Sequence, residues 1–433
     1  CASLGAIEKG RKIHDEILNR GFLKKDIVLG TALVDMYAKC GMLSQAQKVL
    51  QELPDRDAAT WSALITGYMQ LGQDVEALNC FKQMKNEGLS PDKVSLIGIL
   101  KVCGSMRDIE KGEEIHDAIL SRGLLVKDAM LGSALVDMYA KCGQLAKAQQ
   151  LLEELPIRDV VSWSVLIQGY AQQGKGQEAL NCFEQMQTDG FSPDSVTFIC
   201  ILKACVSIGA VDKGGQIHEY IIKRGLLRKD IILGSALVDM YAKCGLLTKA
   251  RQVLEDLPDR NIVTWSSLIA GYAQHGQAHE ALNCIEHMVI EGHSPDEITL
   301  LSGLSACGHS RLLDEAQLLY ENMTRKYGIM PSLEHHTCMV VVFAYAGLFD
   351  KAISVIKMMP YCDYIVIWLT LLGACKKWGN FKLGRLVFNQ VIQLDEECAA
   401  AYVLMANIFV DAGMQVDANK VEALRLSVEE LRK

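Results

Sequence analysis

A group of histidine and cysteine side chains has a spacing that a metal ion could use. Two histidines stand four positions apart, followed by a cysteine and a histidine three positions apart, at His275, His279, Cys284 and His287. Imidazole and thiolate are ligands that zinc prefers, and this spacing suits it. Cys284, however, recurs as Cys80 and Cys182, and neither copy has a histidine nearby. We therefore interpret these side chains as packing or solvent-facing residues and predict no metal site.

Three further cysteines stand in identical pentapeptides, YAKCG, at Cys40, Cys142 and Cys244. A thiol nucleophile needs a base beside it to form the thiolate. No base recurs next to these cysteines, so we expect small buried residues rather than nucleophiles.

A partial match to the zinc cytidine deaminase signature lies near the start of the chain. His14-Asp15-Glu16 fits its H-x-E portion. The equivalent residues further along are His116-Asp117-Ala118, without the glutamate, and the chain contains no C-x-x-C pair. His335-His336 forms no ligand pattern either. The sequence predicts no catalytic residue and no cofactor.

Composition excludes several classes of protein. The 433 residues include 44 Lys plus Arg against 52 Asp plus Glu, a formal net charge of −8. No apolar run approaches the roughly 20 residues of a membrane span. The 15 cysteines form no paired motif, which indicates a reducing compartment. The negative charge argues against a broad, nonspecific polyanion binder, because such affinity comes from neutralised phosphates.

The chain repeats itself every 102 residues. Leu29 to Pro54, Leu131 to Pro156 and Leu233 to Pro258 are nearly the same sequence, and one period holds three units of about 31, 35 and 36 residues. Periods near this length are typical of stacked helical hairpins.

Each unit has the pattern of two helices joined by a glycine turn. Leu135, Met138 and Tyr139 have i, i+3, i+4 spacing, and Gly143 ends that helix. A single hairpin cannot bury its apolar face alone, so neighbouring units must stack into a continuous core. The sequence predicts an all-α solenoid of helix-turn-helix repeats.

Three segments resemble the P, L and S units of plant pentatricopeptide repeat proteins of the PLS subclass. They are VVSWSVLIQGYAQQGKGQEALNCFEQMQTDGFSPD (Val160 to Asp194), KACVSIGAVDKGGQIHEYIIKRG (Lys203 to Gly225) and ALVDMYAKCG (Ala236 to Gly245). The resemblance implies a right-handed superhelix. On its pattern the chain has a partial L unit at 1–26, then S 27–57, P 58–92, L 93–128, S 129–159, P 160–194, L 195–230, S 231–261 and P 262–296.

The remaining residues resemble the terminal parts of that family. Residues 1–296 would be the regular array, 297–364 the terminal L and S repeats, and 365–433 two E motifs. Tyr364 stands where the family usually has an acid, and Val341 and Val342 replace polar residues. The start inside an L unit and the end after the second E motif lead us to expect a fragment, so a deaminase domain could be encoded downstream.

The resemblance implies that each unit binds one nucleotide through its fifth and last residues. The pairs are Thr31/Asp57, Ser62/Asp92, Ser133/Asp159, Ser164/Asp194, Ser235/Asn261 and Ser266/Asp296. A terminal Asp only accepts hydrogen bonds and suits G or U, whereas Asn also donates, as A requires, and Ser or Thr selects purines. Ile97 and Ile199, the fifth residues of L units, cannot hydrogen-bond. The predicted footprint is GGNGGNAGNN, 5′ to 3′. Alternatively, these polar residues are helix caps.

Two further sets of residues have roles in the resemblance. Position two of each unit, which sandwiches bases in the family, carries Val28, Ala59, Val94, Met130, Val161, Val196, Ile232, Val263 and Ile298; alternatively these are core residues. The lysines of YAKCG, at Lys39, Lys141 and Lys243, resemble phosphate contacts, or offset the helix dipole.

The resemblance implies a site-recognition factor for C-to-U editing of organellar transcripts. Its partners would be single-stranded organellar RNA, a cytidine deaminase-type pentatricopeptide repeat protein acting in trans, and small editing cofactors. It implies a mitochondrion or, alternatively, a chloroplast, with any transit peptide outside the given chain. One alternative is an RNA binder that serves splicing or transcript stability, and another is a protein-binding scaffold.

Overall fold

The computed structural model describes residues 7–24, 26–228, 230–359 and 364–431. Within them the regular structure is helical, with 25 α-helices and three short 3₁₀ helices and no strand. The expected all-α fold is confirmed. The chain divides into two compact units, one ending at Ala210 and the other beginning at Val211.

The N-terminal unit alternates first and second helices of the repeats. Its first helices are α2 (Ile27–Lys39), α4 (Ala58–Gln70), α6 (Lys93–Met106), α8 (Ala129–Lys141), α10 (Val160–Gln172) and α12 (Ser195–Ile208). Its second helices are α1 (Ile7–Asn19), α3 (Leu43–Glu52), α5 (Asp74–Asn86), α7 (Ile109–Ser121), α9 (Leu145–Glu154) and α11 (Gly176–Thr188), and the 3₁₀ helices are η2 (Phe22–Lys24) and η3 (Leu124–Lys127).

The C-terminal unit has the same alternation. Its first helices are α14 (Ile231–Lys243), α16 (Ile262–Gln274), α18 (Glu297–Ser310), α20 (Leu333–Tyr345), α22 (Ile365–Lys377) and α24 (Ala399–Asp411). Its second helices are α13 (Val211–Lys223), α15 (Leu247–Asp256), α17 (Ala278–Ile290), α19 (Leu313–Arg325), α21 (Phe349–Met358), α23 (Phe381–Leu394) and α25 (Gln415–Leu431), with one 3₁₀ helix, η4 (Leu226–Arg228).

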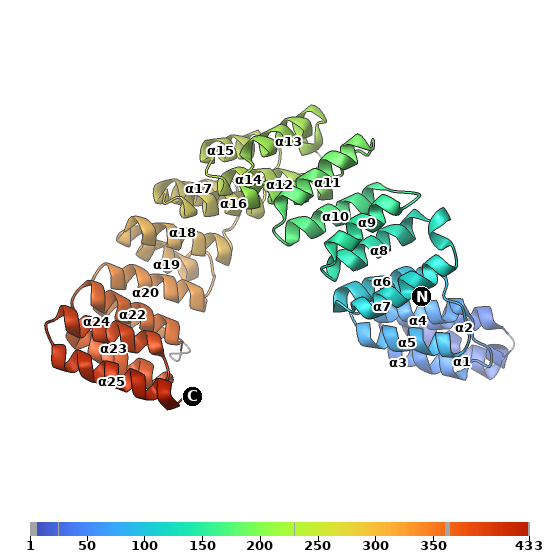
Figure 1. Ribbon diagram of the computed structural model, residues 1–433, viewed down its shortest axis with the longest axis horizontal. Helices are drawn as coiled ribbons and strands as arrows, with labels where there is room; N and C mark the ends of the chain where they lie inside the picture. The colour runs from blue at the N-terminus through green and yellow to red at the C-terminus, as the bar shows by residue number, and fades with distance from the viewer. Residues whose placement is uncertain (1–6, 25, 229, 360–363, 432–433) are drawn as a thin grey trace. The chain divides into compact units, whose positions relative to one another are not determined.

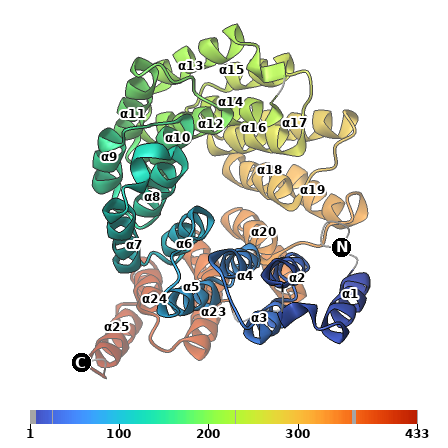
Figure 2. The ribbon, with the colours of Figure 1, turned by 90° about the vertical axis from the view of Figure 1, so that its right-hand side faces the viewer.

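Within each unit the first helices form one layer. Consecutive first helices pack on one another in chain order, and most second helices pack on their own first helix and on the next one (Figures 1 and 2). This is the stacked solenoid predicted from the repeat. The described part of the chain has no helix that is both long and apolar enough to cross a membrane.

Small residues allow the first helices to approach closely. A Cβ added to Gly67 of α4 would lie 2.6 Å from the Cβ of Ala38 in α2, and one added to Gly271 of α16 would lie 2.5 Å from that of Ala242 in α14. Such contacts are too short for real atoms. The turns after the first helices need glycine for another reason: Gly143 has φ of 82°, a left-handed conformation that other residues rarely adopt.

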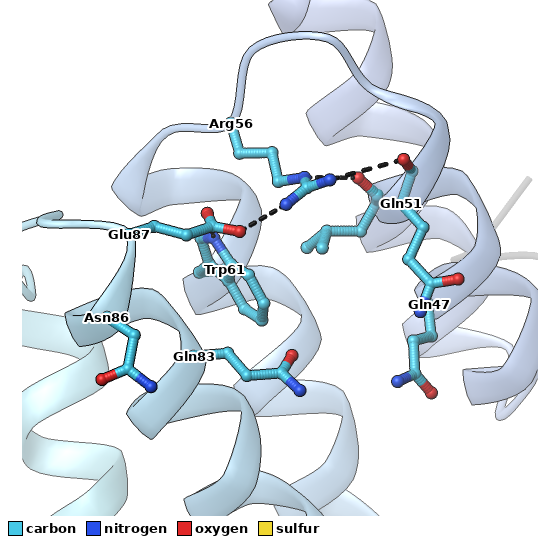
Figure 3. A pocket seen from close by; sticks show the side chains of 8 residues that line it. Gln47, Gln51, Arg56, Trp61, Gln83, Asn86 and Glu87 are labelled. Carbon is cyan, nitrogen blue, oxygen red and sulfur yellow. Dashed lines mark hydrogen bonds and ion pairs between the residues drawn. The ribbon is translucent and has the colours of Figure 1, made fainter.

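In two places a glutamate on a second helix joins the tryptophan of its own first helix to an arginine of the preceding repeat, whereas Nε1 of Trp163 in α10 has no hydrogen-bond partner in the described residues. Glu87 bridges Arg56 and Trp61, accepting from the indole Nε1 at 3.0 Å, and Arg56 also donates to the carbonyl of Leu50 (Figure 3). Arg260, Trp265 and Glu291 repeat this arrangement. These polar links connect successive hairpins.

Candidate nucleic-acid interface

All six terminal residues of the proposed pairs are N-caps of the next first helix. In each, the side-chain Oδ1 accepts from the backbone N–H of the third helical residue at 2.8 or 2.9 Å. The caps are Asp57, Asp92, Asp159, Asp194, Asn261 and Asp296. The helix-cap interpretation is therefore confirmed for the six terminal residues, whereas the fifth residues lie inside the first helices, where each hydroxyl donates to the carbonyl four positions earlier.

The structure also brings each fifth residue to its terminal partner. Ser62 and Ser133 contact Asp92 and Asp159 directly, with Oγ to Oδ1 distances of 2.7 and 2.9 Å. In the other four pairs a threonine hydroxyl joins the two residues. Thr264, for example, donates to Oδ1 of Asn261 at 2.8 Å and lies 2.9 Å from the hydroxyl of Ser235. The same bridge links the pairs that contain Thr31, Ser164 and Ser266.

The cap uses only one terminal atom of each side chain. Within the described residues, Oδ2 of the five aspartates and Nδ2 of Asn261 have no hydrogen-bond partner. All six residues retain solvent exposure. A ligand can thus reach Oδ2 or Nδ2 while Oδ1 holds the helix, so capping and base recognition do not exclude one another.

The residues at position two point into solvent. Among the larger ones, Val28 is 71% exposed and Val161 is 55% exposed. Ala59, Val94, Met130, Val196, Ile232, Val263 and Ile298 are also exposed. The alternative that these are core residues is therefore wrong. Single exposed apolar residues are ordinary on protein surfaces, but here they recur in register on successive first helices.

One cavity combines both kinds of residue. It has a volume of about 270 Å³ and is lined by the pair Ser133 and Asp159, by the position-two residues Met130 and Val161, and by Ile97 of α6 in the preceding repeat. An acceptor-rich polar pair therefore lies beside two apolar side chains from consecutive units. This arrangement can hold a flat ring between aliphatic groups and present a carboxylate oxygen to its edge.

The lysines of YAKCG lie at the other end of the first helices. Lys39, Lys141 and Lys243 are the last helical residues and form ion pairs with the aspartate one turn earlier, at 2.7, 2.8 and 2.9 Å. Their side chains are about half exposed. Their position agrees with the helix-dipole interpretation. A phosphate would have to share each ammonium with its aspartate, and exposed pairs of this kind contribute only about 0.5 kcal/mol.

The cysteines of YAKCG are not fully buried, which corrects the expectation for Cys40, Cys142 and Cys244. Each is the C-cap of its helix, next to the glycine turn. Burial nevertheless raises the pKa of the Cys142 and Cys244 thiols above the ordinary value. Both therefore stay protonated at neutral pH.

The described residues contain no cluster of three or more metal-ligating side chains. Cys284 is buried, and its burial raises the thiol pKa to about 12, whereas His275, His279 and His287 are exposed around it. His14, the histidine of the H-x-E match, lies 3.0 Å from the hydroxyl of Tyr37. The same histidine–tyrosine contact recurs between His116 and Tyr139 and between His218 and Tyr241. This contact was not predicted from the sequence.

The fold and these recurring pairs define a helical-repeat solenoid with one repeated polar and apolar site per unit. Two family models match the chain: the PPR repeat family at residues 56–105, 158–207 and 260–309, and the PPR repeat at 31–57, 133–160, 235–262 and 334–364. A mitochondrial pentatricopeptide repeat-containing protein of Arabidopsis thaliana is 35% identical over 414 residues, covering 96% of this chain and 74% of that protein. This chain belongs to the pentatricopeptide repeat family.

Other relatives are longer. A chloroplastic member from Arabidopsis thaliana is 34% identical, and the match covers 97% of this chain but 48% of that protein. The chain thus spans about half to three quarters of the length of the curated relatives it matches. Among solved structures, the pentatricopeptide repeat protein PPR10 in complex with an 18-nt psaJ RNA element has a TM-score of 0.75 at 18% identity, covering 93% of this chain and 61% of that one. This likeness concerns the fold.

Proposed function

We propose that this chain binds single-stranded RNA in a sequence-specific manner, one nucleotide per unit. The observation that carries the proposal is the geometry of the six pairs. Each brings a hydroxyl and an Asp or Asn together near the start of a first helix, beside exposed aliphatic residues, and among the described residues nothing hydrogen-bonds to Oδ2 or Nδ2. The solved relative of similar fold that carries RNA supports the same assignment.

The proposed reading is GGNGGNAGNN. Asp accepts from the N–H groups of guanine, and Asn261 offers an amide donor to the ring nitrogen of adenine. The last two units have no readable pair. Tyr364, the last residue of the terminal S unit, caps α22 without a side-chain hydrogen bond to the helix.

The biological role that we propose is recognition of a C-to-U editing site in an organellar transcript. A mitochondrion is the first expectation and a chloroplast the second, since relatives with both locations in their names match the chain. The deaminase would act in trans, with small editing cofactors. Splicing or stabilisation of a transcript is the second candidate, because the readable pairs serve it equally well.

The binding experiment compares a GGUGGUAG oligonucleotide with an all-uridine octamer. We expect the purified chain to prefer the first by at least about tenfold, because several base contacts of about 1–3 kcal/mol each are lost in the second. Three lysine contacts predict a slope of about −2 for log affinity against log salt on a single strand. Equal affinity for the two octamers would refute the base-reading assignment.

The role is tested separately from binding. A reporter RNA carrying the footprint upstream of a cytidine is incubated with this chain and a deaminase-containing relative, and conversion to uridine is measured. We expect conversion only when both the chain and the footprint are present. Specific binding without conversion would favour the splicing or stability role over editing.

A further inference from the structure

The regular pattern of the first helices changes in the terminal repeats. The 102-residue offset places Val341 where α14 has Asp239, and Tyr345 where it has Lys243. The ion pair that closes the regular S units is therefore absent from α20. In its place a cavity of about 740 Å³ lies among the last turns of α18, α20 and α22, entirely within the C-terminal unit.

The cavity has cations and aromatic rings in its wall and no acidic residue. Its charged side chains are Arg311 and Lys377. The Lys377 ammonium lies 5.1 Å from the ring centre of Tyr345 and 5.6 Å from that of Trp378. In contrast to Lys243, this ammonium contacts rings and a backbone carbonyl and not a carboxylate. Its charge remains available to an anion.

The position of Trp378 follows from the repeat architecture. At four of the turns, the residue after a first helix lies over the glycine turn of the preceding unit. A Cβ added to Gly41, Gly143 and Gly245 would lie 3.9, 3.8 and 3.2 Å from Leu71, Gln173 and His275, and one added to Gly347 would lie 3.3 Å from Trp378. The indole is held there by a hydrogen bond from Nε1 to the carbonyl of Tyr345 at 3.3 Å, yet Trp378 remains 52% exposed.

Arg311 is the second cation of the cavity. It has φ of 59°, in the left-handed region, where the preceding L unit has Gly209 with φ of 67°. Within the described residues Arg311 has no ion pair. Cys338, also in the wall, has its thiol pKa raised to about 11 by burial and so adds no negative charge at neutral pH.

We propose that this cavity binds an unpaired nucleotide on the 3′ side of the base-read stretch, through stacking on Trp378 and Tyr345 and phosphate contacts to Arg311 and Lys377. Proteins that hold single strands without reading sequence combine cations along the backbone with aromatic stacking platforms. The cavity occupies the same turn of the first helices as Lys243, so it continues the proposed phosphate-contacting end of the array. The proposal rests on the RNA-binding function proposed above.

The experiment measures how the affinity of the chain changes when nucleotides are added to the octamer. GGUGGUAG is compared with the same octamer carrying four uridines at its 3′ end, four uridines at its 5′ end, or four abasic sugar-phosphates at its 3′ end. We expect the 3′ uridines to raise affinity about tenfold. The 5′ uridines should change it less than about twofold, and the abasic extension should give only part of the gain.

The test variants copy residues that other repeats carry at the same positions, so the fold should tolerate them. Trp378→Leu copies Leu71, Lys377→Gln copies Gln274, and Arg311→Gly copies Gly209. Lys357→Gln, on the second helix α21 and outside the cavity, is the matched control for charge. We expect Trp378→Leu to remove most of the 3′ gain and to leave octamer affinity within about twofold, and Lys357→Gln to change neither.

The outcomes separate this inference from the proposed function. If GGUGGUAG and the all-uridine octamer bind equally, the base-reading function fails and this inference fails with it. If the octamer is bound selectively but 3′ uridines add nothing, or add as much to Trp378→Leu as to the unmodified chain, the cavity is not a nucleotide site. That result would leave a polypeptide partner as its occupant.

Discussion

Changing Asn261 to Asp should convert the seventh footprint position from A to G. Asn261 is the only Asn among the six terminal residues, and its Oδ1 caps α16 by accepting from the backbone N–H of Thr264 at 2.9 Å and from its hydroxyl at 2.8 Å. The other five caps accept from the backbone N–H of the third helical residue with an aspartate Oδ1, and Asp57, Asp194 and Asp296 also accept from its hydroxyl. The substitution therefore keeps the cap and replaces only Nδ2, a donor, by an acceptor.

Replacing this one atom affects both the stability of the helix and the preference for a base, and the expected size of each effect can be stated. The helix gains a negative charge at its N-terminus, which is worth about 0.3–1 kcal/mol, so the fold should be unharmed or slightly stabilised. At the base, adenine loses the donor for its ring nitrogen, and guanine gains an acceptor for its N–H groups. A base contact of about 1–3 kcal/mol gives a preference for G over A of roughly tenfold or more.

The assay is binding to four oligonucleotides that differ only at the seventh position. Asp230→Asn is the control, because Asp230 also caps a first helix but ends the repeat at 195–230, whose fifth residue, Ile199, has a side chain that cannot hydrogen-bond. It should change no base preference. An unchanged preference for A in Asn261→Asp, or an equal loss for all four oligonucleotides, would show that Asn261 is a cap and not a reader.

Three further predictions concern folding and chemistry. Asp189→Glu should raise the free energy of unfolding by about 1 kcal/mol in urea titrations, because Asp189 reaches Arg158 at 2.8 Å but leaves the buried Nε1 of Trp163 without an acceptor in the described structure. The reverse change, Glu87→Asp, should lower the free energy of unfolding by about the same amount. An unchanged free energy of unfolding in either variant would contradict the explanation. Burial lowers the pKa of His116 from 6.5, so this imidazole binds a proton less readily in the folded than in the unfolded protein, and stability should fall as pH drops below about 6.5. The urea midpoints of His116→Gln at pH 7.5 and 5.5 should therefore differ less than those of the unmodified chain. An undiminished difference would refute this account. The isolated chain should neither deaminate cytidine nor contain stoichiometric zinc; about one equivalent of zinc together with uridine formed in a purified assay would overturn this expectation.

The sequence predicted the helices well because each repeat supplies independent copies of one pattern. The S unit at 129–159 was expected to contain a helix ended by Gly143, and α8 and α9 lie on either side of that turn. The apolar stripe of a first helix is wide, since it packs on two neighbouring first helices and on its own second helix. Periodicity alone therefore could not decide whether Val161 is buried or exposed.

Features that depend on two units were harder to predict. The sequence shows that Asp189 stands where other repeats have Glu87 and Glu291, but only the distances show that the shorter side chain misses Trp163. Likewise Val341 was recognised as a departure from the pattern. The cavity it borders exists only because the next unit places Trp378 over the glycine turn.

The six proposed reading residues combine two tasks that use different atoms. Oδ1 is committed to the helix N-terminus and to the hydroxyl contact with the fifth residue, so folding fixes where the side chain lies. The other terminal atom differs between Asp and Asn and is free of folding constraints. A change of base preference then needs no change in packing, and because each repeat contacts only its neighbours, it stays local to one nucleotide. If the second atom reads the base as proposed, this separation would allow the footprint to be altered unit by unit while the solenoid that carries it stays the same.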